Sequence, residues 1–242
     1  MHLTDPHLFA AADASLRGRV TYATLQQVLA HIAESDWPAD HLQITGDIIQ
    51  DDTRMAYLRF REALEPVGLP VYCVPGNHDI RDIMRDVLQD EPFHYCGSIE
   101  ANNWLIVGVD SCMESNAAGY IEDGELERLE GLVQSTPADH VMVCLHHPPL
   151  PIGSRWLDEL GLQNGEQFLQ RIAPGKVRLV IFGHVHQAFD DVFRSVRILG
   201  TPSTCRQFAT GSDRYALDDK PPAYRRLALY ADGSVDTELV WI

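Results

Sequence analysis

Five short motifs between residues 5 and 186 carry side chains that could bind metal ions. Their aspartate, asparagine and histidine residues offer oxygen and nitrogen donors without a thiolate, a set that suits Mn, Fe, Zn or Co. The motifs are Asp5-Pro6-His7, Gly46-Asp47, Gly76-Asn77-His78-Asp79, His146-His147-Pro148-Pro149 and Gly183-His184-Val185-His186.

The number of candidate ligands favours a two-metal centre. A single tetrahedral ion needs only three or four ligands, and the motifs supply more. If one carboxylate bridges, each of two ions receives four protein ligands, which is the composition of a two-metal hydrolase. The seven candidates are Asp5, His7, Asp47, Asn77, His146, His184 and His186.

The elements that must position these residues are short apolar strands, predicted at 41–45, 70–74, 104–109, 141–145 and 177–182. Helical patterns lie between them, because apolar residues recur on one face over 25–32, 126–133 and 168–172. This alternation predicts an α/β fold with a largely parallel core sheet. In such sheets ligands bind outside the carboxyl ends of the strands, so we expect the motifs to converge there. The motif glycines suit sharp turns out of a strand.

The pattern changes after about residue 189, where strands at 192–193, 196–199, 227–230 and 235–241 follow with few helices. Asp232-Gly233 indicates a hairpin between the last two. We expect these strands to form or complete a second sheet, and residues 203–224 to form a long ordered loop or arm. Residues 1–242 are predicted to be one domain, with the arm and hairpin (about 203–242) completing the second sheet.

Composition excludes several classes of protein. The formal charge of −16 argues against binding to nucleic acid or an anionic membrane, so an anionic substrate would need a local positive centre such as bound metal. No apolar run approaches a membrane span, and the first residues do not resemble a secretory signal. The five cysteines are odd in number and contain no C-x-x-C pair, which indicates a reduced, cytoplasmic protein.

The ordered motifs resemble the calcineurin-like metallophosphoesterase superfamily, whose pattern is D-x-H, G-D, G-N-H-[DE], H and G-H-x-H. All five are present in the family's order. The segments 201–208, 217–219 and 221–222 are similar to the bacterial class III cyclic-nucleotide phosphodiesterase branch. The resemblance therefore covers nearly the whole chain.

The resemblance implies a four-layer αββα sandwich and a centre that prefers Fe and Mn. One ion would be held by Asp5, His7, Asp47 and His186, and the second by Asn77, His146 and His184, with Asp47 bridging. The side chains expected to contact the substrate are His7, Asp47, Asn77, His78 and His186. A small phosphodiester is the expected partner, and a homodimer is one expectation for the oligomeric state.

One departure from the family concerns the first motif. Only four residues precede Asp5, where relatives have a full apolar strand. Either translation starts upstream of Met1, or the strand is short and the first metal binds less tightly.

The expected chemistry is attack on phosphorus by a metal-bound hydroxide, with His78 as general acid for the leaving alkoxide and Asp79 orienting its ring. Two divalent ions carry a charge of +4, and Asp5, Asp47 and a hydroxide together carry −3, so the centre has a net charge of about +1. This charge suits a phosphodiester better than a monoester dianion. The resemblance of the C-terminal segments implies hydrolysis of 3′,5′-cyclic AMP to 5′-AMP, which is the leading prediction.

Other functions on the same fold are hydrolysis of glycerophosphodiesters or 2′,3′-cyclic nucleotides, and DNA hydrolysis, which the missing basic surface disfavours. A non-catalytic scaffold would have lost ligands, and none is missing. Of the neighbouring residues, His147 is balanced between packing and function. Asp110-Ser111 favours a turn or cap, and Arg206 favours pairing with surface acids.

Overall fold

The computed structural model describes residues 1–242 and contains two six-stranded mixed sheets. The first has the order β16 (Val235–Trp241), β15 (Ala223–Leu229), β1 (His2–Leu3), β4 (Leu42–Thr45), β5 (Val71–Val74), β6 (Phe93–Tyr95). The second has the order β11 (Phe189–Phe193), β12 (Val196–Gly200), β10 (Val177–Phe182), β9 (His140–Cys144), β8 (Trp104–Gly108), β7 (Ser98–Ala101).

Both sheets have a parallel centre and antiparallel edges. Strands β1, β4, β5 and β6 are parallel neighbours, as are β8, β9, β10 and β12. The antiparallel neighbours are β15–β16, β7 and β11. Every predicted strand is present and the parallel pairing is confirmed, but the strands predicted for one core sheet divide between two: β4 and β5 lie in the first, and β8, β9 and β10 in the second.

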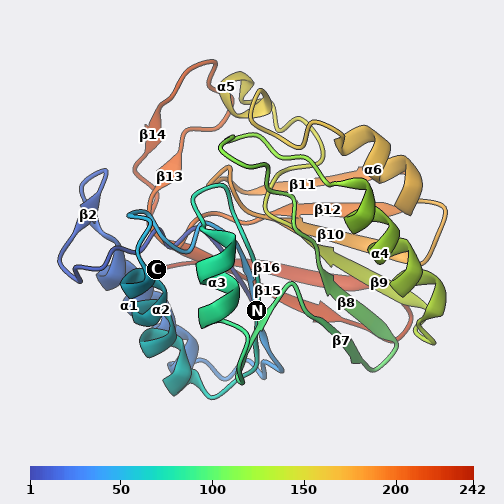
Figure 1. Cartoon of the computed structure of the whole chain (residues 1–242), viewed down its shortest axis with the longest axis horizontal. Helices are drawn as coiled ribbons and strands as arrows, with labels where there is room; N and C mark the ends of the chain where they lie inside the picture. The colour runs from blue at the N-terminus through green and yellow to red at the C-terminus, as the bar shows by residue number, and fades with distance from the viewer.

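Helices cover the outer face of each sheet, which gives the four-layer sandwich (Figure 1). On the first sheet lie α1 (Thr21–Glu34), α2 (Arg54–Leu64), the 3₁₀ turn η1 (Glu65–Val67) and α3 (Arg81–Val87). On the second lie α4 (Asp123–Ser135) and α6 (Gly165–Ile172), with the short α5 (Arg155–Asp158) near the arm. Helix α1 buries Leu25, Val28, Leu29 and Ile32, the stripe that its spacing predicts.

Side-chain alternation along the strands separates the apolar layers. In β8, Leu105 and Val107 pack with α4 and α6, whereas Trp104 and Ile106 face the layer between the two sheets. Successive side chains of a strand point to opposite faces, so a strand covered on both sides reads as a continuous apolar run. This explains why these short segments lack alternation in the sequence.

The sequence suggested that the strands after residue 189 belong to one sheet, but the structure divides them between the two sheets. Strands β11 and β12 extend the second sheet beside β10, but the β15–β16 hairpin pairs with β1 and extends the first sheet. The prediction that the C-terminal hairpin completes the second sheet is therefore wrong. The N-terminal strand is only His2–Leu3, and it needs a neighbour on the side away from β4, which β15 supplies.

Two small hairpins stand apart from the sheets. The predicted arm contains β13 (Gln207–Phe208) paired with β14 (Leu217–Asp218). A second hairpin pairs β2 (Ser15–Leu16) with β3 (Arg19–Val20) just before α1. Figure 1 shows both on the same side of the molecule, at the edge where the parallel strands end.

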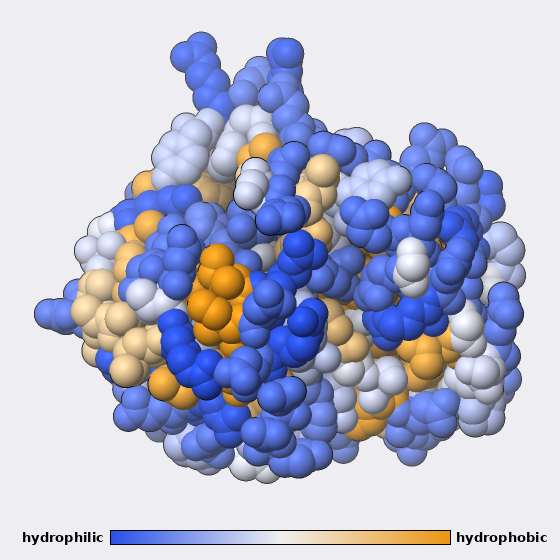
Figure 2. Space-filling view, in the orientation of Figure 1, coloured by the Kyte–Doolittle hydropathy of each residue, from blue (hydrophilic) through white to orange (hydrophobic).

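The surface is mainly polar. In Figure 2 the visible face is largely hydrophilic, with apolar residues in small separate groups, as expected for a chain with a formal charge of −16. None of the helices has the length and apolar content that a bilayer crossing requires.

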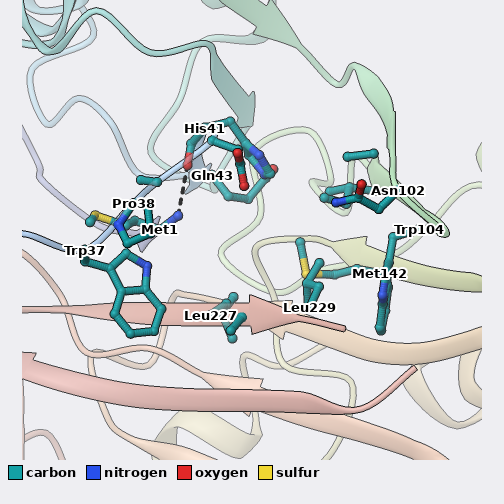
Figure 3. Close-up of a pocket in the computed structure, with 15 residues that line it drawn as sticks. Met1, Trp37, Pro38, His41, Gln43, Asn102, Trp104, Met142, Leu227 and Leu229 are labelled. Carbon is teal, nitrogen blue, oxygen red and sulfur yellow. Dashed lines mark hydrogen bonds between the residues drawn. The ribbon is translucent and has the colours of Figure 1, made fainter. Parts of the chain in front are cut away.

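A cavity of about 330 Å³ lies between the sheets at the amino ends of the parallel strands. Figure 3 shows Trp37, Trp104, Met142 and Leu229 among the residues that surround it. None of the seven candidate ligands contributes to this cavity. The predicted ligands therefore lie at the opposite end of the sheets, where the parallel strands have their carboxyl ends.

Candidate metal centre

The seven candidate ligands converge at the carboxyl ends of strands from both sheets. Six are buried and Asn77 is partly exposed. Each ligand motif follows a strand. The parallel strands of the two sheets bring together residues that are up to 181 positions apart in the chain, as Asp5 and His186 are. The seven ligands come from the loops after β1 (Asp5, His7), β4 (Asp47), β5 (Asn77), β9 (His146) and β10 (His184, His186).

The first group of donor atoms surrounds His186. Its Nε2 lies 3.3 Å from Oδ1 of Asp5 and 3.1 Å from Nε2 of His7. Nε2 of His7 in turn lies 3.7 Å from Oδ2 of Asp47. Four side chains therefore direct oxygen and nitrogen atoms at one small volume, as ligands of a transition metal do.

The second group surrounds His146. Its Nε2 lies 3.4 Å from Oδ1 of Asp47, 3.2 Å from Oδ1 of Asn77 and 3.2 Å from Nδ1 of His184. Asp47 thus presents one carboxylate oxygen to each group. A carboxylate between two sets of ligands is the arrangement that a bridged pair of ions requires.

Backbone hydrogen bonds orient two of the ligand histidines, and the rings differ in charge. Nδ1 of His146 donates to the backbone oxygen of Thr45 at 2.7 Å, and Nδ1 of His186 donates to that of Arg206 at 2.5 Å. A proton held on Nδ1 leaves Nε2 free to coordinate. Burial lowers the pKa of His7 and of His184 to about 3, so both rings are neutral, as metal binding requires. Burial also lowers the pKa of His146, but the Asp47 carboxylate outweighs it and raises that pKa to about 9, so a cation would displace a proton there. The donor set therefore fits two cations.

The backbone of the centre is held in an unusual conformation. Asp5, His7, Asp47, His184 and His186 all have positive φ, between 47° and 66°. This left-handed region is uncommon for residues other than glycine and costs of order 1–3 kcal/mol at each position. Such strain persists only where the surrounding structure fixes it, and it is concentrated at functional sites.

A chain of buried hydrogen bonds between the sheets supports Asp5. Arg225, in β15, donates to Oγ1 of Thr201, which bonds to His2. His2 bonds to Thr45, whose hydroxyl donates to Thr4. The hydroxyl of Thr4 then lies 2.6 Å from Oδ2 of Asp5. The C-terminal hairpin is therefore connected to the position of a candidate ligand.

Gly183 provides a test of how tightly the centre is packed. A Cβ atom at this position would lie 1.9 Å from Oγ1 of Thr4 and 2.7 Å from Oδ2 of Asp5. We expect Gly183→Ala to lower kcat/KM by about 10²-fold, because a displacement of about 1 Å has that effect in an active site. Steady-state kinetics and metal content measure it.

The matched control is Gly131→Ala in α4, where an added Cβ meets no atom within 4 Å. We expect this variant to keep full activity and gain stability, since alanine favours a helix. Equal activity of the two variants would show that the ligand loops tolerate displacement.

The predicted contact between Asp79 and His78 is absent. The carboxylate of Asp79 instead accepts hydrogen bonds from the backbone N–H of Gly76 at 2.8 Å and Ile48 at 3.1 Å, and from the hydroxyl of Tyr57 at 3.0 Å. Burial and the charge of Asp47 raise the pKa of Asp79 to about 7. Asp79 therefore ties two ligand loops together, and the sequence prediction that it orients His78 is wrong.

His78 has a different neighbour, which sequence reasoning missed. Its Nδ1 lies 3.4 Å from Nε2 of Gln50, and its ring meets that of His7 edge to face at 5.1 Å. The backbone N–H of His78 also donates to Oδ1 of Asp47 at 2.9 Å. His78 lines a pocket of about 130 Å³ together with five of the candidate ligands.

His147, which the sequence left balanced between packing and function, lies beside the candidate ligands. It forms a group with His146 and His184 whose ligand atoms lie within 4.8 Å of one another. Its Nδ1 is 2.8 Å from the hydroxyl of Ser111, which also accepts from the backbone N–H of His146 and His147. Ser111 thus fixes the loop that carries His146.

Two minor predictions concern residues beside the centre. Oδ1 of Asp110 accepts from the backbone N–H of Cys112 at 2.9 Å, which confirms a turn role. Arg206 pairs with Asp219 at 3.0 Å, which confirms a surface ion pair.

Comparison with known proteins agrees with this geometry. Residues 1–188 match the family model described as calcineurin-like phosphoesterase. The chain belongs to the calcineurin-like phosphoesterase family. This family uses a dinuclear metal centre, so the chain is a metal-dependent phosphoesterase. The candidate ligands around Asp47 form groups that could hold metal ions.

Curated relatives of this calcineurin-like phosphoesterase span nearly the whole chain. The 3′,5′-cyclic adenosine monophosphate phosphodiesterase CpdA of Pseudomonas aeruginosa is 36% identical over 98% of this chain and 87% of its own length. The enzyme of the same name in Escherichia coli K12 is 34% identical, covering 99% and 88%. A 3′,5′-cyclic-nucleotide phosphodiesterase of Nostoc is 33% identical, covering 98% and 90%.

Solved structures share the fold at low sequence identity. TT1561 of Thermus thermophilus superposes with a TM-score of 0.65 at 14% identity, over 98% of this chain and 96% of that one. GAP50 of Plasmodium reaches 0.67 at 13% identity, over 99% and 83%. These likenesses support the sandwich fold alone.

Proposed function

We propose that this phosphoesterase hydrolyses 3′,5′-cyclic nucleotides, and cAMP above all, to the 5′-monophosphate. The single observation that carries the two-metal chemistry is the position of Asp47, with Oδ2 3.7 Å from His7 and Oδ1 3.4 Å from His146. The substrate class is supported by relatives at 32–36% identity that are named as cAMP phosphodiesterases.

The chain's residues divide the work as follows. Asp5, His7, Asp47 and His186 would hold one cation, and Asp47, Asn77, His146 and His184 the other. Fe and Mn are the proposed ions because the family resemblance implies them; the oxygen and nitrogen donor set accepts both, as it also accepts Zn or Co. When bound, such a pair lowers the pKa of a water and withdraws charge from the phosphoryl group.

His78 would protonate the leaving ribose oxygen. The side-chain amide of Gln50 lies 3.4 Å from Nδ1 of His78 and orients the ring, so Nε2 is the nitrogen left to pass a proton to the substrate. His78 lines the pocket beside Asn77 and is partly exposed there. A general acid needs this combination of access to substrate and a fixed ring orientation. Asn77 and His186 line the same pocket and would contact the phosphoryl oxygens.

The substrate is proposed to be a small molecule that reaches the centre in the cytoplasm. The pocket beside the ligands measures about 130 Å³, and the −16 charge disfavours a polynucleotide. The five cysteines form no disulfide, as is usual in a reducing compartment.

A substrate panel tests the proposal. Purified protein loaded with Mn²⁺ or Fe²⁺ would be assayed with 3′,5′-cAMP, 2′,3′-cAMP, a glycerophosphodiester and bis-p-nitrophenyl phosphate. We expect the highest kcat/KM of the three natural esters for 3′,5′-cAMP, by at least about tenfold, since about 1.4 kcal/mol of selective contact gives that ratio. The product would be 5′-AMP. Turnover of the artificial ester alone would contradict the assignment.

A further inference from the structure

The β2–β3 hairpin carries a residue that its local structure does not favour. The two-residue loop is Arg17-Gly18, and both residues have positive φ, 50° and 79°. A loop of this kind is the type I′ turn, in which Asn-Gly is strongly preferred. Arginine has no local reason to occupy the first position, and a strained residue that persists points to a role in function.

The side chain of Arg17 lies against the aromatic residues of the C-terminal arm. Its Cζ is 4.8 Å from the ring centroid of Phe208 and 5.6 Å from that of Tyr215. The ring of Phe208 lies 4.5 Å from that of His186 and is tilted by 31°. One aromatic ring therefore separates the guanidinium from a candidate metal ligand, and Arg17 lines the same pocket as Asn77.

Two hydrogen-bond donors at this pocket have no acceptor in the protein. Nη1 of Arg17 and Nε1 of Trp156 are both buried and unpartnered. Trp156 packs edge to face on Phe208, with ring centroids 5.0 Å apart. A buried donor without an acceptor is costly, so this wall is suited to a ligand that supplies acceptor atoms and a flat surface. We call Arg17, Trp156, Phe208 and Tyr215 the aromatic wall.

We propose that the aromatic wall binds the nucleoside part of the substrate, with Arg17 donating to acceptor atoms of the base or sugar. This inference rests on the proposed function. The phosphoryl oxygens belong to the ligand groups around Asp47, whereas the nucleoside is the part of a cyclic nucleotide that must extend away from them. Aromatic faces and guanidinium planes are common surfaces for an unpaired base.

Arg17→Asn separates this role from a structural one. Asparagine suits the turn, so we expect the melting temperature to stay the same or rise. We expect kcat/KM for cAMP to fall by about ten- to hundredfold, mainly through KM, as for loss of a charged hydrogen bond. Activity on bis-p-nitrophenyl phosphate, which has no nucleoside, should change by less than about twofold. Arg19→Asn, in the same hairpin but outside the pocket, is the control and should leave both activities unchanged.

The outcomes separate the competing explanations. Equal losses on both substrates would place Arg17 at the phosphoryl group, and a lowered melting temperature with equal losses would make its role structural; either result overturns the inference. Unchanged cAMP kinetics in Arg17→Asn would overturn it as well. Wild-type protein that hydrolyses bis-p-nitrophenyl phosphate but not cAMP would instead overturn the proposed function, together with the inference that depends on it.

Discussion

Asp47→Ala is expected to lower kcat/KM for cAMP by at least about 10³-fold, the largest effect of any single substitution in this protein. Both groups of ligands depend on this carboxylate, because its two oxygens face His7 and His146 respectively. Its removal leaves each group one anionic ligand short. Elemental analysis of the purified variant should find fewer than two ions per chain.

Stability separates this loss from misfolding. Asp47 is buried, and its pKa lies well below the usual value. Burial alone would raise this pKa, but the nearby imidazoles, His146 foremost, lower it by more than burial raises it. Circular dichroism and the melting temperature should show that the variant folds. Asp36→Ala, which removes an exposed carboxylate, is the control and should be fully active. Near-normal turnover of Asp47→Ala with two ions bound would refute the bridging role.

His78→Ala should produce the second largest effect, and its size should depend on the leaving group. We expect a loss of about 10²–10⁴-fold on cAMP, the usual contribution of a general acid. A ribose alkoxide needs a proton as it leaves, whereas nitrophenolate does not. Loss on bis-p-nitrophenyl phosphate should therefore be smaller by at least about tenfold.

The neighbour of His78 supplies a graded control. Gln50→Ala removes the amide 3.4 Å from Nδ1 of His78 but keeps the imidazole. We expect a smaller loss on cAMP than for His78→Ala, with the same dependence on the leaving group. If His78→Ala reduces both substrates equally, the histidine binds substrate and does not protonate the leaving oxygen.

The sequence was sufficient to predict that the candidate ligands converge and that strands precede them. Except for Asp5-Pro6-His7, each motif combines a donor residue with a preceding apolar run, as in residues 177–182 before His184, and both signals are local. The stripe of Leu25, Val28, Leu29 and Ile32 likewise specifies a helix by its period alone. Because parallel strands place their carboxyl ends at one edge, the strand order was not needed to expect convergence.

Local patterns did not reveal several shorter elements. Helices α2 and α3, strands β6 and β7 and the β2–β3 hairpin were not predicted. Helix α2 begins where the hydroxyl of Thr53 accepts from the backbone N–H of Ala56 at 3.2 Å, a capping signal that was available in the sequence. The others are at most seven residues long, so their period is too short to recognise.

Only the tertiary structure decided which groups meet. Asp79 follows His78 in the chain, yet its carboxylate bonds to the backbone of Ile48 and Gly76, and the neighbour of His78 is Gln50. The β15–β16 hairpin joined the first sheet because β1 offered an unpaired side. Arg17 meets Phe208 across 191 positions of chain. A sequence period specifies which face of an element is buried, but the partner of a polar group is chosen by hydrogen bonding and packing between segments that the period does not connect.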